Sequence, residues 1–305
     1  MTSLRFAVIG AGRLGASLAL ALRAKGLELV AYSAHTPAGR AKAEAWLGGS
    51  AVADLRDVVL MAPDLYFLTV PDSVLPAVAS RLGELLTDQT GALVAHTSGA
   101  TSVAVLEPCA RRRATTFAFH PLQTFSDPTI GCERFPGIAV AVTPGAHGHD
   151  PEAARVGFAL ARLLGAKPFL LADEKRALYH AAATMACNYF VTLEHEAQGL
   201  FVRAGLPTDE ALGLFLPLVR ATLDNLEAQG TIKALTGPLS RGDVQTVRGH
   251  LSALARYAPN LLPLYQTLGL ATLDLVEARA EVGATTIGEL VTLLSPSQGY
   301  DEADT

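Results

Sequence analysis

The chain has 305 residues, of which half are apolar and 17% are charged, and its formal net charge at pH 7 is −5. A chain of this length and apolar content can bury a full core and favours two domains, and its few charges exclude extended disorder. The acidic balance argues against a nucleic-acid partner and against binding to a membrane surface.

The first apolar run, residues 6–9, has the length and bulk of a buried parallel strand. A turn with the spacing Gly10-x-Gly12-x-x-Gly15 follows it, and a helical pattern begins at Leu14. In this context Gly10 permits the tight turn, Gly12 lets the backbone approach a pyrophosphate, and Gly15 lets the helix pack on the strand. The first N–H groups of the helix, at Arg13 and Leu14, then face the phosphates. We predict a dinucleotide site; the alternative is a mononucleotide fold that has lost its ligand.

The second predicted strand, residues 28–32, ends where a dinucleotide fold selects its cofactor. A carboxylate there would bind the ribose 2′-hydroxyl, whereas uncharged or basic groups accommodate a 2′-phosphate. The segment has no carboxylate at that end, and its polar residues are Ser33, His35, Thr36 and Arg40. Hydroxyl groups and an arginine, with Arg13 as a second cation, favour NADP over NAD. The alternative is that Ser33 and Thr36 only cap the next helix.

Five later apolar runs also predict strands, at residues 65–70, 92–95, 115–119, 138–142 and 167–171. Several of them become polar or rich in glycine and proline at their carboxyl ends. These ends line one crevice in an open parallel sheet, and ligands bind there. We therefore assign Val70 and Pro71 to the cofactor, and Ser98 and His120 to the reacting end. The fold class is α/β, with a Rossmann doubly wound parallel sheet over residues 1–172.

Three smaller features of this domain also carry expectations. Asp72 is expected to cap the helix that follows it, and residues 124–137 are expected to form a loop over the crevice. His147 and His149 could bind a metal ion, but a solvated turn is favoured because no other ligands lie nearby in the sequence. We therefore predict no metal site.

From Glu174 onward the patterns are helical, over residues 174–204, 208–229, 244–257, 260–280 and 287–294. We predict an all-α C-terminal domain over residues 173–295 and a frayed tail over 296–305. Asp243 is expected to cap the helix that starts at 244, and Arg241 remains open as a clamp for an anionic substrate.

One face of the first of these helices carries a polar stripe with a spacing of four residues: Arg176, His180, Thr184 and Asn188. Such a stripe either forms hydrogen bonds in the core or lines a cleft, and we favour the cleft because something must close the crevice. Lys175 lies on another face and joins the site only if the first turn is distorted or its side chain reaches across.

Hydride transfer needs a group that moves a proton, and histidine titrates near neutral pH. His120 is our first choice for this role and His180 the second. Ser98 and Asn188 are expected to orient a carbonyl or carboxylate group. We interpret His96 as a packing or turn residue.

The motifs together resemble one bacterial family. They are Gly10-Ala11-Gly12-Arg13-Leu14-Gly15, His96-Thr97-Ser98-Gly99-Ala100, His120-Pro121-Leu122-Gln123-Thr124-Phe125, Lys175-x-x-x-Tyr179-His180 with Asn188, and residues 236–243. Its members pair a Rossmann-like NADP-binding domain with a C-terminal helical domain of unknown function. The family is similar to the 6-phosphogluconate dehydrogenase, pyrroline-carboxylate reductase and F420-dependent NADP reductase group. The resemblance implies NADP and a helical domain often used for dimerisation, and it implies no substrate.

Two neighbouring families bear on the mechanism. In β-hydroxyacid dehydrogenases a catalytic lysine stands four residues before an asparagine that Asn188 matches, but Thr184 stands at the lysine position here. Prephenate dehydrogenases have a layout that Ser98, His120-Pro121 and His180 resemble better. However, Gln123-Thr124 stands where those enzymes have a glycine.

We therefore expect an NADP-dependent oxidoreductase that transfers a hydride to or from a small polar, carboxylate-bearing metabolite. The alternatives are a non-catalytic NADP-binding sensor or scaffold dimer, and an oxidoreductase that works between NADP and a deazaflavin (F420). Three widely separated cysteines, a first strand close to Met1 and the lack of a long uncharged apolar run predict a cytoplasmic protein outside the membrane. Apolar runs at residues 212–216 and 261–264 predict a homodimer.

Overall fold

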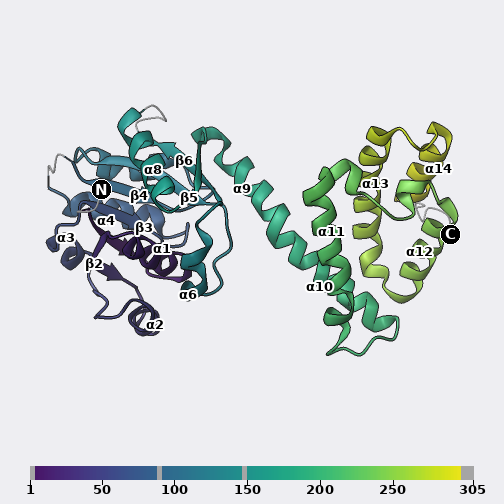
Figure 1. Ribbon diagram of the computed structural model, residues 1–305, viewed down its shortest axis with the longest axis horizontal. Coiled ribbons are helices and arrows are strands. Elements are labelled where there is room, and N and C mark those ends of the chain that lie inside the picture. The colour runs from purple at the N-terminus through teal and green to yellow at the C-terminus, as the bar shows by residue number, and fades with distance from the viewer. Residues whose placement is uncertain (1–3, 88–90, 146–149, 297–305) are drawn as a thin grey trace, which may run out of the picture. The chain divides into compact units, whose positions relative to one another are not determined.

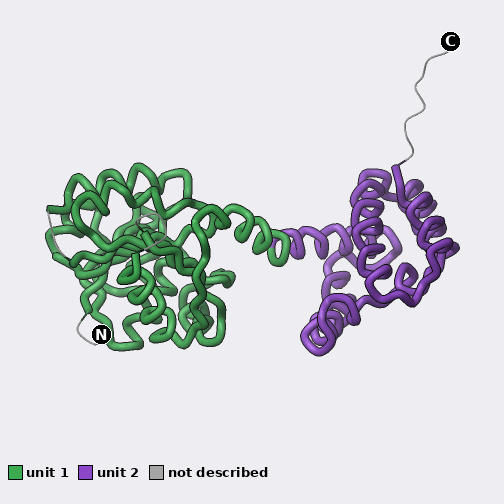
Figure 2. The backbone as a smooth tube through the Cα atoms, turned by 90° about the horizontal axis from the view of Figure 1, so that it is seen from above, with its two compact units in different colours: residues 1–187 green, residues 188–305 purple. Residues whose placement is uncertain are grey.

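The computed structural model describes residues 4–87, 91–145 and 150–296. The chain divides into two compact units, residues 1–187 and 188–305 (Figure 2). The domain boundary predicted after residue 172 lies earlier in the sequence than this division and stays a prediction. We describe each unit by itself.

Unit 1 is built on a seven-stranded sheet with the order β2-β1-β3-β4-β5-β6-β7 (Figure 1). The strands are β1 (Arg5–Ile9), β2 (Glu28–Ser33), β3 (Leu65–Leu68), β4 (Leu93–His96), β5 (Thr115–Pro121), β6 (Ala139–Pro144) and β7 (Lys167–Leu170). All pairs are parallel except β5 and β6, which are antiparallel. The fully parallel sheet of the sequence prediction is therefore wrong at this one pair, where the chain re-enters the sheet from the end at which β5 leaves it.

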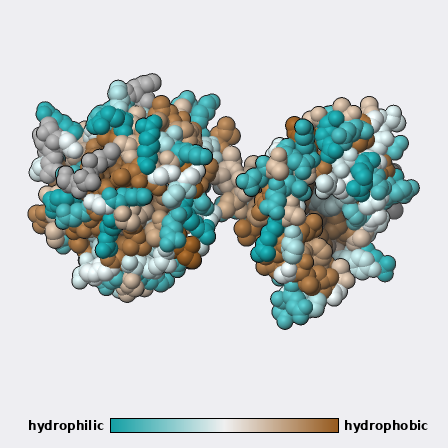
Figure 3. Space-filling view, in the orientation of Figure 1, coloured by the Kyte–Doolittle hydropathy of each residue, from teal (hydrophilic) through white to brown (hydrophobic). Residues whose placement is uncertain are grey.

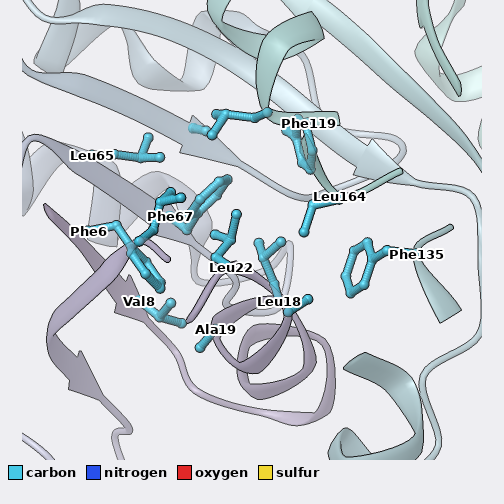
Figure 4. Packing of buried hydrophobic residues seen from close by; sticks show 14 of the residues in the cluster. Phe6, Val8, Leu18, Ala19, Leu22, Leu65, Phe67, Phe119, Phe135 and Leu164 are labelled. Carbon is cyan, nitrogen blue, oxygen red and sulfur yellow. The ribbon is translucent and has the colours of Figure 1, made fainter. Parts of the chain in front are cut away.

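Helices cover both faces of the sheet because successive strand residues point to opposite sides. Phe6 and Val8 of β1 pack into one core with α1 (Arg13–Ala24) and α8 (Pro151–Leu163), part of which is drawn in Figure 4. Ala7 and Ile9 pack into a second core with α3 (Leu55–Leu60), α4 (Leu75–Leu85) and α5 (Glu107–Ala110). The remaining segments of unit 1 are α2 (Pro37–Leu47), the 3₁₀ turns η1 (Val103–Leu106), η2 (Cys132–Arg134) and η3 (Asp173–Lys175), α6 (Pro128–Gly131) and α9 (Arg176–Thr184).

Two local expectations for unit 1 need correction. The α4 helix has Val74 at its N-cap and no side-chain cap, so Asp72 does not cap it. Residues 124–137 are not an open loop, because they contain α6 and η2. A Cβ added to Gly131 of α6 would meet the Ser17 hydroxyl of α1, which shows that this segment packs on α1.

Unit 2 is helical, as the sequence predicts. Its elements are α10 (Phe190–Arg203), α11 (Ala211–Ala234), η5 (Leu239–Arg241), α12 (Val244–Tyr257), η6 (Pro259–Leu261), α13 (Leu262–Arg279) and α14 (Ala284–Leu294). Gly230 breaks α11 with a φ of 75°, directly after the predicted helix end at residue 229. Asp243 caps α12 as expected, since its carboxylate accepts the Thr246 N–H at 3.0 Å. The predicted tail beyond residue 296 lies outside the described residues.

The run from α9 to α10 is interrupted by a π-helix, Met185–Tyr189. Asn188 lies in this π-helix, and the stripe that it would share with Arg176, His180 and Thr184 stays a prediction. None of the helices described is long and apolar enough to cross a membrane.

Candidate functional site

The glycine turn after β1 is held by hydrogen bonds to the ends of two neighbouring strands. Gly10 has a φ of 94°, and a Cβ added there would lie 2.6 Å from Val70 Cγ1, so both its conformation and its surroundings require glycine. The Gly10 N–H donates to the carbonyl of Ser33, the last residue of β2, at 3.0 Å. The Thr69 hydroxyl after β3 donates to the Gly10 carbonyl at 2.7 Å. These bonds fix the turn at the carboxyl edge of the sheet.

The other two glycines have the roles that their spacing predicts. A Cβ on Gly15 would lie 2.8 Å from the Gly10 carbonyl oxygen and 3.0 Å from Val8 Cγ1, so the absence of a side chain lets α1 pack on β1. A Cβ on Gly12 would have only the Gly10 carbonyl oxygen nearby, at 3.9 Å. The space beside Gly12 is therefore open, at the N-terminus of α1.

A cavity of about 1040 Å³ lies within unit 1 along the carboxyl ends of the strands. It brings together the predicted residues Gly10, Gly12, Arg13, Leu14, His35, Val70, Pro71, Ser98, His120 and His180. Sequence reasoning did not select Lys42, Trp46, Asp72 and Gly99, which also line it. One continuous space thus joins the glycine turn to two histidines.

The other predicted residues do not belong to this lining. Thr36 caps α2, because its hydroxyl accepts the Gly39 N–H at 3.0 Å. The Arg40 guanidinium donates to the carbonyls of Ala34 and His35 at 3.3 and 3.0 Å. Ser33 contributes its carbonyl to the glycine turn, and Gly15 packs beneath that turn. Asn188 is the first residue of unit 2, and its part in the site stays a prediction.

The α2 helix presents a cation and an aromatic ring to the cavity. Lys42 and Trp46 lie four residues apart and therefore share a helix face, and both line the cavity together with Gly39. The Lys42 side chain is exposed and Trp46 is half-buried. Steps of three and four residues stay on one face of a helix, and from the Thr36 cap they lead to Lys42 and Trp46. Helix periodicity could therefore have identified this pair in the sequence.

The two histidines face each other from β5 and α9. The ring centroids of His120 and His180 are 6.0 Å apart, with an angle of 74° between the ring planes. A Cβ added to Gly99 would meet His180 Cδ2 and would lie 2.8 Å from His120 Nε2. Both imidazoles therefore approach the backbone at Gly99, directly after the predicted Ser98.

His120 is held by a tyrosine that sequence reasoning did not select. Tyr179 Oη lies 2.9 Å from His120 Nδ1, and the rings meet edge to face. Burial lowers the pKa of His120 to about 4, with Arg176 and His180 acting in the same direction and Asp72 opposing them. Burial also raises the pKa of Tyr179 to about 12. Its place in the motif Lys175-x-x-x-Tyr179-His180 is the sequence signal that could have drawn attention to Tyr179.

Arg176 begins α9 and is fully buried, so it faces the protein interior and not the cavity. Its Nε donates to the Thr101 carbonyl at 2.6 Å, its Nη1 to Thr143 Oγ1 at 2.8 Å, and its Nη2 to the Ser98 carbonyl. Burial lowers the pKa of this guanidinium. The three bonds attach the start of α9 to the segment after β4 and to β6, which positions the helix that carries Tyr179 and His180.

Ser98 and His96 have different surroundings although both lie at the end of β4. The Ser98 hydroxyl oxygen accepts the Thr101 N–H at 2.9 Å, and its own proton can be donated into the cavity. His96 is fully buried, and neither ring nitrogen has a hydrogen-bond partner among the described residues. Burial lowers its pKa to about 3, so His96 is a neutral packing residue, as the sequence interpretation has it.

The remaining candidate positions lie elsewhere. Lys175 is exposed and does not belong to the cavity lining, within the part of the chain that is described. Arg241 belongs to unit 2. His147 and His149 lie outside the described residues, and the described ones contain no cluster of His, Cys, Asp and Glu that could hold a metal ion.

Comparisons with known proteins agree with this architecture. Residues 1–121 match the model of a Rossmann-like domain, and residues 142–272 match that of a domain of unknown function, DUF2520. No curated protein matches the chain in a sequence search. The chain thus carries a Rossmann-like domain followed by a DUF2520 domain.

Solved structures resemble the chain over most of its length. A protein from Bacteroides fragilis that has been suggested to be an NADP oxidoreductase is 26% identical, with a TM-score of 0.71 over 88% of this chain and 96% of that one. A protein from Thermotoga maritima is 22% identical, with a TM-score of 0.67 over 90% and 100%. The 1-pyrroline-5-carboxylate reductase of Streptococcus pyogenes is 18% identical, with a TM-score of 0.60 over 96% and 100%. The last two likenesses concern the fold alone.

Proposed function

We propose that this chain, in which a Rossmann-like domain precedes a DUF2520 domain, is an NADP-dependent oxidoreductase acting on a small polar, carboxylate-bearing metabolite. The observation that carries the proposal is the cavity that joins the glycine turn to His120 and His180. The name of the protein from Bacteroides fragilis also supports it.

The residues at the cofactor end fit a dinucleotide phosphate. The space beside Gly12 is open to a pyrophosphate, and the N–H groups of the first turn of α1 have no partners within the helix. Arg13 and Lys42 line the same cavity and carry the positive charges that a 2′-phosphate requires. Trp46 offers an aromatic surface beside Lys42. We assign the 2′-phosphate to Lys42, which lines the cavity. The sequence predicts Arg40 for this role, and Arg40 does not belong to the lining.

The residues at the other end of the cavity fit proton transfer to a carbonyl or imine. When bound, NADPH supplies a hydride to the reacting carbon and is itself oxidised. His120 and His180 supply the hydrogen-bonding and proton-transferring groups, and the Ser98 hydroxyl orients the substrate.

We further propose that the protein is cytoplasmic, because its three cysteines form no disulfide in the described structure.

Transfer of deuterium tests this proposal. NADPH deuterated at C4 of the nicotinamide is mixed with the protein and a panel of small 2-oxo acids, cyclic imino acids and a deazaflavin. We expect an oxo or imino acid to be reduced to a product heavier by one deuterium, and His180→Asn to abolish the transfer while NADPH affinity stays the same. NADPH binding without transfer to any acceptor would support the sensor, and transfer to the deazaflavin alone would support the third alternative.

A further inference from the structure

The contact between His120 and Tyr179 joins the end of β5 to α9. Their atoms Nδ1 and Oη lie 2.9 Å apart, and the ring centroids 5.4 Å apart at nearly a right angle. Arg176, one turn before Tyr179, fixes this helix through three hydrogen bonds. The ring of Phe169 meets the Tyr179 ring edge to face, with its centroid 6.0 Å away. The phenol is therefore held in place toward the imidazole.

Both partners of this hydrogen bond are uncharged at neutral pH. Charged and titratable groups reach His120 from three places: Arg176, Tyr179 and His180 on α9, His96 on β4, and Asp72 after β3. Burial, Arg176 and His180 lower the pKa of His120 to about 4, so its imidazole is neutral at neutral pH. The Tyr179 phenol keeps its proton, because burial raises its pKa to about 12.

A neutral imidazole has one nitrogen that donates and one that accepts. Among the described residues, the hydrogen-bond partner of Tyr179 Oη is His120 Nδ1. If the phenol proton occupies that bond, Nδ1 accepts it, and the imidazole proton is on Nε2. This nitrogen lies on the side of Gly99, where a side chain would come within 2.8 Å of it. His120 would then present an N–H donor at the wall of the cavity that His180 also lines.

We propose that Tyr179 is a positioning residue that holds neutral His120 as the Nε2–H tautomer, so that His120 donates a hydrogen bond to the reacting oxygen or nitrogen of the substrate. The proton itself is transferred by His180. In the direction of reduction, negative charge grows on the substrate atom next to His120 Nε2–H, and that atom takes a proton from the His180 imidazolium, which becomes neutral. A fixed donor aimed at growing charge stabilises the transition state. This assignment rests on the proposed function only in naming the substrate atom.

Nitrogen NMR of the full chain, without cofactor or substrate, tests the tautomer. The protein is labelled with ¹⁵N-histidine, and the His120 signals are assigned as those lost in His120→Asn. We expect a proton-bearing Nε2 and an accepting Nδ1 in the unmodified protein at neutral pH. The Tyr179→Phe variant removes the donor and should shift the Nδ1 resonance of His120.

The chain contains a matched control, because Tyr265 Oη lies 2.8 Å from His250 Nδ1 in unit 2. Tyr265→Phe should shift the signals of His250 and leave those of His120 unchanged. A protonated Nδ1 in the unmodified protein would overturn the proposal, and so would an Nδ1 resonance of His120 that does not respond to Tyr179→Phe. The first outcome is measured on the unmodified protein and uses His120→Asn only for assignment, so misfolding of Tyr179→Phe does not obscure it. Because no cofactor is present, the result is independent of whether NADPH binds.

Discussion

His96 at the end of β4 and His120 near the end of β5 differ from a histidine in water, because His96 is fully buried and His120 is partly buried. Neither His96 nitrogen has a partner among the described residues, and His120 has Tyr179 on one side and a cation nearby. Their pKa values of about 3 and about 4 lie below the usual value of 6.5. Between about pH 3 and pH 6.5 the unfolded chain binds more protons than the folded one, so the free energy of unfolding rises with pH. The stabilisation is complete above pH 6.5 and is lost as the pH falls toward 3.

The first prediction uses His96, which the mechanism does not need. His96→Leu removes a buried polar group that has no hydrogen-bond partner among the described residues. It also removes the loss of stability that protonation of this group causes in acid. The free energy of unfolding of the unmodified protein, from urea titrations, should fall more than that of the variant between pH 7 and pH 5. The difference should be about 2 kcal/mol. Exposed His250→Asn serves as the control, and equal losses in the unmodified and His96→Leu proteins would contradict a neutral, buried His96.

A second prediction concerns cofactor choice at α2. The sequence predicts that Arg40→Ala erases most of the preference for NADPH over NADH, but this guanidinium donates to two backbone carbonyls. Lys42 lines the cavity, so Lys42→Ala should weaken NADPH binding about tenfold and leave NADH unchanged, as expected for a lost charge-assisted hydrogen bond. Calorimetry measures both affinities, with exposed Lys25→Ala as the control. Equal affinities for the two cofactors in the unmodified protein would refute a 2′-phosphate site.

At the scale of elements, sequence patterns predicted the features that depend on neighbouring residues in the chain. The seven strands, the glycine turn and the Asp243 cap depend on residues close in sequence, and the structure contains them. The direction of β6 and the burial of Arg176 depend on contacts between distant segments. Arg176 was expected in a cleft because its spacing matched His180, but its three acceptors come from after β4 and from β6. Tyr179 was missed for the same reason, since only the fold brings it to His120.

The glycine turn gives a third prediction that separates folding from binding. Gly10→Ala should destabilise the protein, because Gly10 has a positive φ and Val70 stands in the way of a side chain. Gly12→Ala should leave the melting temperature nearly unchanged and greatly weaken NADPH binding, because the new methyl group enters open space beside the proposed pyrophosphate. Thermal melts and calorimetry on both variants measure this. Normal NADPH affinity in Gly12→Ala would place the cofactor elsewhere.

At the scale of the whole molecule, we propose that the chain forms a homodimer through unit 2. The sequence selected residues 212–216 and 261–264, but Phe215 and Leu261 are buried within unit 2. Leu214 of the first run is 56% exposed, and further exposed apolar side chains lie along α10 and α11, among them Val191 and Leu218, which are 64% and 65% exposed. Figure 3 shows such apolar surface on unit 2. Exposed apolar faces of this kind are typical of interfaces.

The fourth prediction tests this surface. The mass from light scattering should be that of a dimer, and Leu218→Asp should lower it to that of a monomer at the same concentration. Leu60→Asp is the control, because Leu60 is 74% exposed in unit 1 and should leave the dimer intact. A monomer at all concentrations in the unmodified protein would rule out the proposed dimer.

The central claim is that one cavity holds the dinucleotide with its nicotinamide beside the two histidines, and a crystal structure with NADPH bound tests it most directly. We predict the pyrophosphate at Gly12, the 2′-phosphate beside Lys42, and the nicotinamide C4 atom within about 8 Å of both imidazoles, close enough for a small substrate to bridge them. A nicotinamide ring away from His120 and His180, or a dinucleotide bound outside this cavity, would contradict the account.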